Sequence, residues 1–218
     1  MFKLMMKKNL WMISVLLLVL TTEAQTLKKA TEAQAKLMVE KINRTAAGIR
    51  TMDCQFTQVK TLRFLNDKMT SQGRMFFMAD GGRLRWEYQQ PYQYTFVLNG
   101  QKVHVKTADR QQTIDIAQSR LLQSVARVMM NSLTGKSLVA DSDFACVMYT
   151  QGDEWVAQLT PKRKEIKKMF KEIRLHFSSG RQMVTLVEMT ELSGDSTVIT
   201  LNNVKTNGHV DAKMFDAQ

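Results

Sequence analysis

The sequence predicts a mainly β protein with one domain, built as a meandering antiparallel sheet with two helical segments. Apolar and polar residues alternate in short runs between residues 52 and 106, and again between 143 and 206. Turn residues such as Asn99-Gly100, Gly152 and Gly194-Asp195 separate the runs. Two other stretches, 27–50 and 117–133, have apolar residues at helical spacing. No repeat, low-complexity tract or linker divides the chain, so one domain is expected.

Residues 1–24 have the order of a secretory signal peptide. Three lysines lie within the first eight residues, and an apolar run, broken only by Ser14, follows over residues 10–20. Thr22 and Ala24 are small residues placed as in a cleavage site. The run is too short to span a bilayer comfortably, and no stop-transfer pattern follows, which disfavours an uncleaved anchor. We therefore predict cleavage after Ala24 and a soluble, exported chain of residues 25–218.

The first helix is predicted over residues 27–50. Leu37, Ile42 and Ile49 lie near one helical stripe, while charged residues occupy the other side. Gly48 marks its expected end.

Strands follow this helix. The runs 52–59 and 73–79 are both apolar in alternation, the second less regularly. In the next run the side chains at 84, 86 and 88 are large and apolar, those at 83, 85 and 87 are charged, and Pro91 stops the pattern. Asn99-Gly100 then predicts a hairpin whose second arm has Val103 and Val105 on one side.

The second helix is predicted over residues 117–133, where Gly135 follows the apolar stripe. Five more strand patterns come after it, at 143–150, 154–161, 170–179, 182–192 and 196–206. Two amphipathic helices are enough to cover one apolar face of such a sheet. The sixteen methionines are compatible with a cavity for variable apolar ligands or with the filling of gaps in a solid core.

The chain is basic, with a formal net charge of +11. Its densest basic run, residues 161–174, is predicted as a connection between strands that either touches anionic membrane or is merely solvated. Nucleic acid is disfavoured as a partner by export and by the lack of interleaved stacking aromatics.

Cys54 and Cys146 are the only cysteines. An exported chain permits a disulfide between them, and two buried thiols are an equal alternative. Their spacing matches no metal or redox motif.

An enzyme is disfavoured because none of the three histidines lies in a catalytic or metal-binding motif. His104 and His176 fall on the polar side of predicted strands, where solvated surface is expected. No catalytic residue, metal or cofactor is predicted.

An ordered set of short motifs resembles the LolA family of periplasmic outer-membrane lipoprotein carriers. Nearly the whole mature chain takes part, and the motifs are Phe56-x-Gln58, Gly73, Arg85–Tyr88 with Pro91, Leu98–Val103, Trp155 to Pro161, Ile173-x-Leu175-x-Phe177, residues 194–207 and Phe215. The resemblance implies a half-closed antiparallel β-barrel covered by a helical lid. It also implies a monomeric carrier that holds the acyl chains of lipoproteins in an apolar cavity and moves them from the inner to the outer membrane. Its partners would be a lipoprotein-releasing ABC transporter and an outer-membrane acceptor.

Combined with the alternation, the resemblance indicates the residues that line the cavity. The strand residues are Phe56, Leu84, Trp86, Tyr88, Val103, Leu175 and Phe177, and the lid residues are Val128, Met129 and Leu133. The family usually has a basic residue and proline before the Trp86 strand, and Asp80-Gly81 stands there in this chain. The alternatives are a carrier or sensor of another lipid or apolar ligand on the same scaffold, or an interaction protein that carries no ligand.

Overall fold

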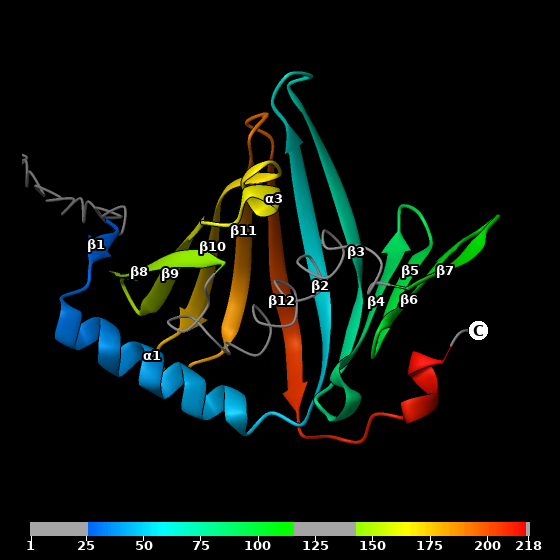
Figure 1. The fold of residues 1–218 in the computed structure, drawn as a ribbon, viewed down its shortest axis with the longest axis horizontal. Coiled ribbons are helices and arrows are strands. Elements are labelled where there is room, and N and C mark those ends of the chain that lie inside the picture. The colour runs from blue at the N-terminus through cyan, green and yellow to red at the C-terminus, as the bar shows by residue number, and fades with distance from the viewer. Residues whose placement is uncertain (1–25, 116–142, 217–218) are drawn as a thin grey trace, which may run out of the picture.

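The computed structural model describes residues 26–115 and 143–216, and Figure 1 shows how their elements are arranged. The helices are α1 (Glu32–Ala47) and α3 (Lys164–Lys167), with 3-10 turns η1 (Asp80–Gly82) and η3 (Ala212–Phe215). The strands are β1 (Lys28–Lys29), β2 (Thr51–Leu62), β3 (Asp67–Met78), β4 (Arg83–Gln90), β5 (Tyr94–Asn99), β6 (Lys102–Thr107), β7 (Gln111–Asp115), β8 (Phe144–Gln151), β9 (Glu154–Pro161), β10 (Phe170–Ser178), β11 (Val184–Glu191) and β12 (Ser196–Thr206).

All the described strands form one antiparallel sheet. Their order is β1-β8-β9-β10-β11-β12-β2-β3-β4-β5-β6-β7, so β1 and β7 are the two edges and the sheet is not closed. Most neighbouring strands are consecutive in sequence, whereas β12 pairs with β2 and β1 pairs with β8 across long stretches of the chain. The mainly β fold with an open antiparallel sheet agrees with the sequence prediction.

Helix α1 begins later than the sequence predicts. Thr31 and Gln34 form a capping box, which sets the first turn at Glu32, and the preceding Lys28–Lys29 pair with β8 instead. The buried side of α1 holds Met38, Val39, Ile42 and Ala46. Leu37, predicted in the buried stripe, is 52% exposed. Figure 1 shows α1 running along the β8–β12 half of the sheet.

Three segments differ from the sequence prediction. Strands β2 and β3 extend the predicted runs by a long, mostly exposed hairpin end from Val59 to Gln72. Strand β7 was not predicted, because its QQTID sequence has no apolar alternation. The basic run 161–174 is not a simple loop, since it holds the end of β9, the short helix α3 and the first half of β10.

Each strand separates two faces of the sheet. Apolar residues of the face that α1 covers, which we call the inner face, form one large buried cluster that includes α1 side chains. A second, small cluster lies on the outer face, where Phe76 and Val97 pack with Phe215 of η3. Arg85 Nη1 and Asn99 Nδ2 donate hydrogen bonds to the carbonyl groups of Met214 and Phe215, which hold this end of the chain against β4 and β5.

Candidate functional site

The inner face brings together every strand residue that the sequence predicted for the cavity. Phe56, Leu84, Trp86, Val103, Leu175 and Phe177 belong to the large buried cluster, and Tyr88 packs against it partly buried. They come from β2, β4, β6 and β10, which are widely separated in the sheet order. The apolar surface therefore runs continuously across the sheet. Val128, Met129 and Leu133 of the predicted lid lie outside the described residues.

An aromatic group forms the β2–β4 part of this face. The Phe56 and Trp86 rings stack with centroids 4.3 Å apart, and the Tyr88 ring meets Phe56 edge-on at 5.1 Å. Gly73 of β3 lies opposite both Phe56 and Tyr88 in the register. A β-carbon at residue 73 would lie only 2.5 Å from Phe56 Cζ. The close approach of ring and backbone therefore requires glycine at this position.

Two polar groups lie within the aromatic group. The Tyr88 hydroxyl donates a hydrogen bond of 2.9 Å to Gln58 Oε1. Burial raises the pKa of Tyr88, although the neighbouring Trp86 N–H and Gln58 act in the opposite direction. Trp86 Nε1 is buried, and it makes no well-formed hydrogen bond with any residue the structure describes. This part of the face thus offers a hydrogen-bond donor as well as apolar area.

Cys54 and Cys146 are free thiols in this structure. They lie on β2 and β8, which are not neighbours in the sheet, and Cys146 Sγ lies 3.9 Å from Met148 Sδ. The disulfide alternative is therefore not the arrangement seen here. Burial raises the pKa of Cys54 to about 12 and that of Cys146 to about 11, so both thiols stay protonated near neutral pH.

His176 corrects the expectation of a solvated histidine, because only 8% of it is exposed. It lies on the outer face, with Nδ1 3.2 Å from Glu154 Oε2 and Nε2 3.7 Å from Glu188 Oε2. Burial is the largest influence and lowers the pKa of His176. The two nearby carboxylates of Glu188 and Glu154, the latter hydrogen-bonded to Nδ1, together outweigh it, so the pKa is raised. No sequence pattern indicates this arrangement, because the two glutamates come from β9 and β11.

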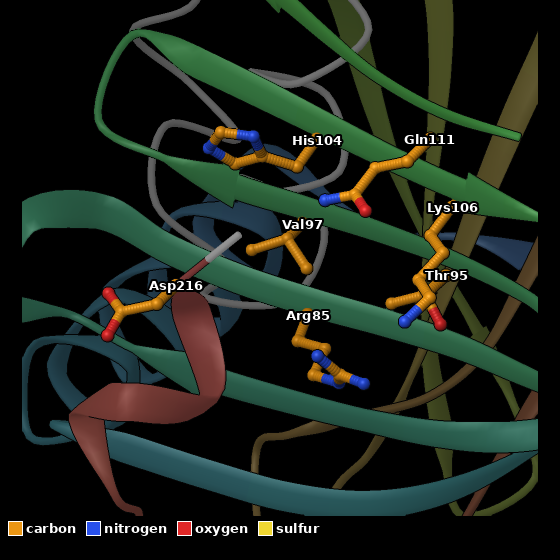
Figure 2. Close-up of a pocket in the computed structure, with 7 residues that line it drawn as sticks. All are labelled: Arg85, Thr95, Val97, His104, Lys106, Gln111 and Asp216. Carbon is orange, nitrogen blue, oxygen red and sulfur yellow. The ribbon is translucent and has the colours of Figure 1, made fainter. Parts of the chain in front are cut away.

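The outer face also has a small polar pocket of about 50 Å³. Figure 2 shows its lining, with side chains from β4 to β7 and Asp216 beside η3. Arg85 pairs there with Glu87 at 2.9 Å, and His104 Nδ1 lies 2.8 Å from Thr113 Oγ1. These side chains alternate with those of the inner face, so the pocket does not belong to the apolar surface.

The Arg83 side chain points away from the inner face. Its Nη2 lies 3.0 Å from Asp80 Oδ2 next to η1, and it alternates along β4 with the inward Leu84. Within residues 26–115 and 143–216, no group of three His, Cys, Asp or Glu side chains is placed to hold a metal ion. The same ranges contain no helix that is long and apolar enough to cross a membrane.

Comparison with known proteins identifies the family. The model of the family described as outer membrane lipoprotein carrier protein LolA matches residues 47–218. The outer-membrane lipoprotein carrier protein of Pseudomonas aeruginosa (strain PAO1) is 30% identical over 168 residues, which cover 76% of this chain and 76% of that protein. Its counterpart in Legionella pneumophila (strain Corby) is 26% identical over 186 residues, covering 84% and 85%.

A solved structure supports the fold alone. The crystal structure of an uncharacterized conserved protein from Thermus thermophilus has a TM-score of 0.52 at 8% identity, and the match covers 84% of this chain and 96% of that one. Together with the open sheet and its apolar face, the family match over most of the sequence leads to one conclusion. The chain belongs to the LolA family of outer membrane lipoprotein carrier proteins.

Proposed function

We propose that the protein is a periplasmic carrier that binds the acyl chains of lipoproteins on the inner face of its sheet and moves them from the inner to the outer membrane. The observation that carries this proposal is the single apolar face that extends from β6 to β10, with α1 along its β8–β12 half. The family match supports a carrier, and the names of the relatives refer to lipoproteins. The leader-like residues 1–24 support export to the periplasm.

An acyl chain suits this face because burial of a methylene group is favourable by about 0.8 kcal/mol. A chain of ordinary length would then bind too tightly to be released without a compensating cost. In the structure the inner face is covered, and its side chains contact one another and α1. Cargo must displace these contacts, so the free energy of displacement offsets part of the affinity and makes release feasible.

The covering helix is tied at both ends. Before its first turn, Ala30 N–H donates to the Met148 carbonyl group at 2.9 Å. After its last turn, Asn207 Nδ2 donates to the Gly48 carbonyl group at 3.0 Å. Admission of cargo under α1 therefore requires the middle of the helix to shift or one of these ends to release.

Transfer in both directions requires a donor and an acceptor. We propose that a lipoprotein-releasing ABC transporter loads the protein, that an outer-membrane acceptor unloads it, and that the carrier works as a monomer. No catalytic step is needed, because binding and release move the cargo without covalent chemistry.

Native mass spectrometry of exported protein, purified without detergent, is the direct test. We expect a chain that begins at Gln25 and co-purifies with an acylated lipoprotein. Co-purification of another lipid would instead assign a different cargo to the same face. Delipidated protein that takes up no fluorescent palmitate would disprove the carrier function.

Variants of the inner face locate the binding surface. Trp86→Glu should abolish uptake of fluorescent palmitate, because a carboxylate on the apolar face has no partner there. Tyr88→Glu is a milder second variant, since Tyr88 is only partly buried. Thr95→Glu on the outer face is the matched control and should bind normally, with circular dichroism confirming that each variant is folded.

A further inference from the structure

The hairpin that joins β2 to β3 ends in two exposed apolar side chains. Phe64 is 95% exposed and Leu65 is 65% exposed, and both lie in the four-residue turn between Leu62 and Asp67. Figure 1 shows this hairpin rising beyond the rest of the sheet. Large apolar residues placed this far from the core contribute nothing to its packing, and adjacent exposed ones mark an interaction site.

A second turn supports the hairpin and adds to its apolar surface. The Arg63 N–H donates a hydrogen bond of 2.9 Å to Asp195 Oδ1 in the β11–β12 turn. The Arg63 side chain also lies against Gly194, where an added β-carbon would come within 3.0 Å of Arg63 Cδ. Leu192 in the same turn is 62% exposed. We call Phe64, Leu65 and Leu192 the apolar tip.

A cluster of cations adjoins the apolar tip. Leu192 N–H donates to the Met169 carbonyl group at 3.3 Å, and Leu192 and Lys168 line the same shallow recess beside α3. Figure 1 shows α3 at the same end of the sheet as the two turns. We call the exposed lysines here the basic cluster: Lys162, Lys164, Lys167, Lys168 and Lys171.

In the part of the chain that the structure describes, none of the ion pairs involves a lysine of the basic cluster. Among residues 26–115 and 143–216, no carboxylate lies within 4.0 Å of any of its five ammonium groups. Two glutamates at this end have other cationic partners, since Glu191 lies 3.1 Å from Lys60 and Glu165 lies 4.0 Å from Arg163. Among the described residues, these exposed lysines are thus left to interact with anions outside the chain.

We propose that the apolar tip and the basic cluster together dock the protein on an anionic lipid bilayer. Phe64, Leu65 and Leu192 would enter the boundary between head groups and acyl chains, while the lysines would contact lipid phosphates. Apolar burial and electrostatic attraction to anionic lipid are the two contributions that reversible membrane binding combines. A projecting tip can enter a fluid bilayer without a matching surface, whereas a protein partner would need a complementary hollow. This inference does not depend on the cargo proposed above.

Vesicle co-sedimentation of the mature chain tests the proposal. Wild-type protein should bind vesicles of phosphatidylcholine with about 30% phosphatidylglycerol far more tightly than pure phosphatidylcholine, and most tightly at low salt, where screening is weakest. The triple variant Lys164→Gln, Lys167→Gln, Lys168→Gln should weaken binding about fivefold for each lysine, or roughly a hundredfold in total. The double variant Phe64→Ser, Leu65→Ser should weaken it by roughly tenfold or more, and this loss should persist at high salt.

Matched controls come from the opposite end of the sheet. Lys36, Lys205 and Lys213 are exposed, and their triple change to Gln removes the same charge. Leu37→Ser removes an exposed leucine from α1. Both controls should bind vesicles nearly as wild type does, and circular dichroism should show that all variants are folded.

Three results would overturn the proposal. The first is wild-type protein that stays in the supernatant with anionic vesicles at low salt. The second is a lysine control that loses as much affinity as the basic-cluster variant, because net charge alone would then explain binding. The third is a Phe64, Leu65 variant that binds vesicles normally. If that variant also abolished self-association in sedimentation velocity, the apolar tip would belong to a contact between two copies.

Discussion

Gly73 lies on β3 between β4 and the Phe56 ring, where there is no room for a β-carbon. Its position follows from the register, in which residue 73 faces Phe56 on one side and Tyr88 on the other. Any side chain here would meet the Glu87 carbonyl oxygen and the Phe56 ring. The stacked Phe56 and Trp86 rings of the inner face thus depend on a residue that contributes no side chain.

Substitution of this glycine should be costly. We expect Gly73→Ala to lower the free energy of unfolding by about 1–3 kcal/mol or more, because the β-carbon forces the ring and backbone apart. Urea denaturation measures the change. Gly180→Ala is the matched control, since its nearest neighbour, Ser178 Oγ, would lie at 3.9 Å from the new carbon. Equal stability of Gly73→Ala and wild type would contradict the observed packing.

His176 should make stability depend on pH. Its folded pKa is above the ordinary value of 6.5, so the protonated ring stabilises the fold fully below 6.5, and this contribution is lost as pH rises through the raised pKa. The close approach of the His176 ring lowers the pKa of Glu188, so the carboxylate contribution is present above 4.5 and is lost as pH falls through the lowered pKa. The His176–Glu188 pair therefore stabilises the folded state most between the lowered pKa of Glu188 and the raised pKa of His176.

The measurement compares wild type with His176→Gln across this range. The difference in unfolding free energy should be about 1 kcal/mol near pH 6, because both glutamates are partly exposed. It should shrink as the pH is raised toward 8. His209→Gln, at an exposed position, is the matched control. A constant difference from pH 5 to 8 would rule out a charged His176.

Helix α1 is held by its cap as well as by its apolar side. Gln34 N–H donates to Thr31 Oγ1 at 3.3 Å, and Thr31 N–H donates to Gln34 Oε1 at 2.9 Å. The capping box fixes where the helix starts, and thereby which side chains face the sheet. Thr31 and Gln34 can be seen in the sequence, but apolar spacing alone predicts a helix that begins at residue 27.

Removal of the cap should loosen the cover of the inner face. We expect Thr31→Ala to reduce stability by about 1 kcal/mol, and a double-mutant cycle with Gln34→Ala should reveal coupling between the two side chains. Thermal unfolding followed by circular dichroism measures both. Thr45→Ala, near the other end of α1, is the control. Additive effects of Thr31→Ala and Gln34→Ala would show that the reciprocal bonds do not matter.

At the scale of the molecule, the inner face joins strands that are far apart in the sheet. Val105 of β6 and Met189 of β11 both pack against the large cluster while remaining partly exposed. If one acyl chain lies across this face, residues at both places contact the same ligand. The proposed function therefore makes a prediction about two distant positions.

We expect Val105→Ser and Met189→Ser each to weaken the retention of fluorescent palmitate several-fold, since each removes apolar area from the same surface. Titration of delipidated protein measures the affinities. Val198→Ser lies on β12 among the outer-face positions and should bind as wild type does. If only one of these two variants lost affinity, the ligand would contact only that part of the inner face, which would contradict the prediction.

The inner face of the sheet can be read from the amino-acid sequence. Alternation with a period of two assigns Leu84, Trp86 and Tyr88 to one side of a strand whatever its neighbours are, because successive side chains point to opposite faces. The hairpin was likewise predictable from Gly100, since the turn needs the positive φ that this glycine adopts, although the turn residues are Gly100 and Gln101 and Asn99 ends the strand. Every strand residue predicted for the cavity therefore reached the same cluster.

The cover of each face and the length of each strand depend on contacts between distant parts of the chain. The surroundings of His176 on β10 include Glu154 of β9 and Glu188 of β11. Val97 of β5 is buried against Phe215, which comes from the far end of the chain. The projection of Phe64 and Leu65 depends on where the neighbouring strands stop, since β4 pairs with β3 only as far as Gln72 and β12 begins opposite Thr61. Alternation describes the surroundings of one strand at a time, whereas these features arise from contacts between segments that are distant in sequence.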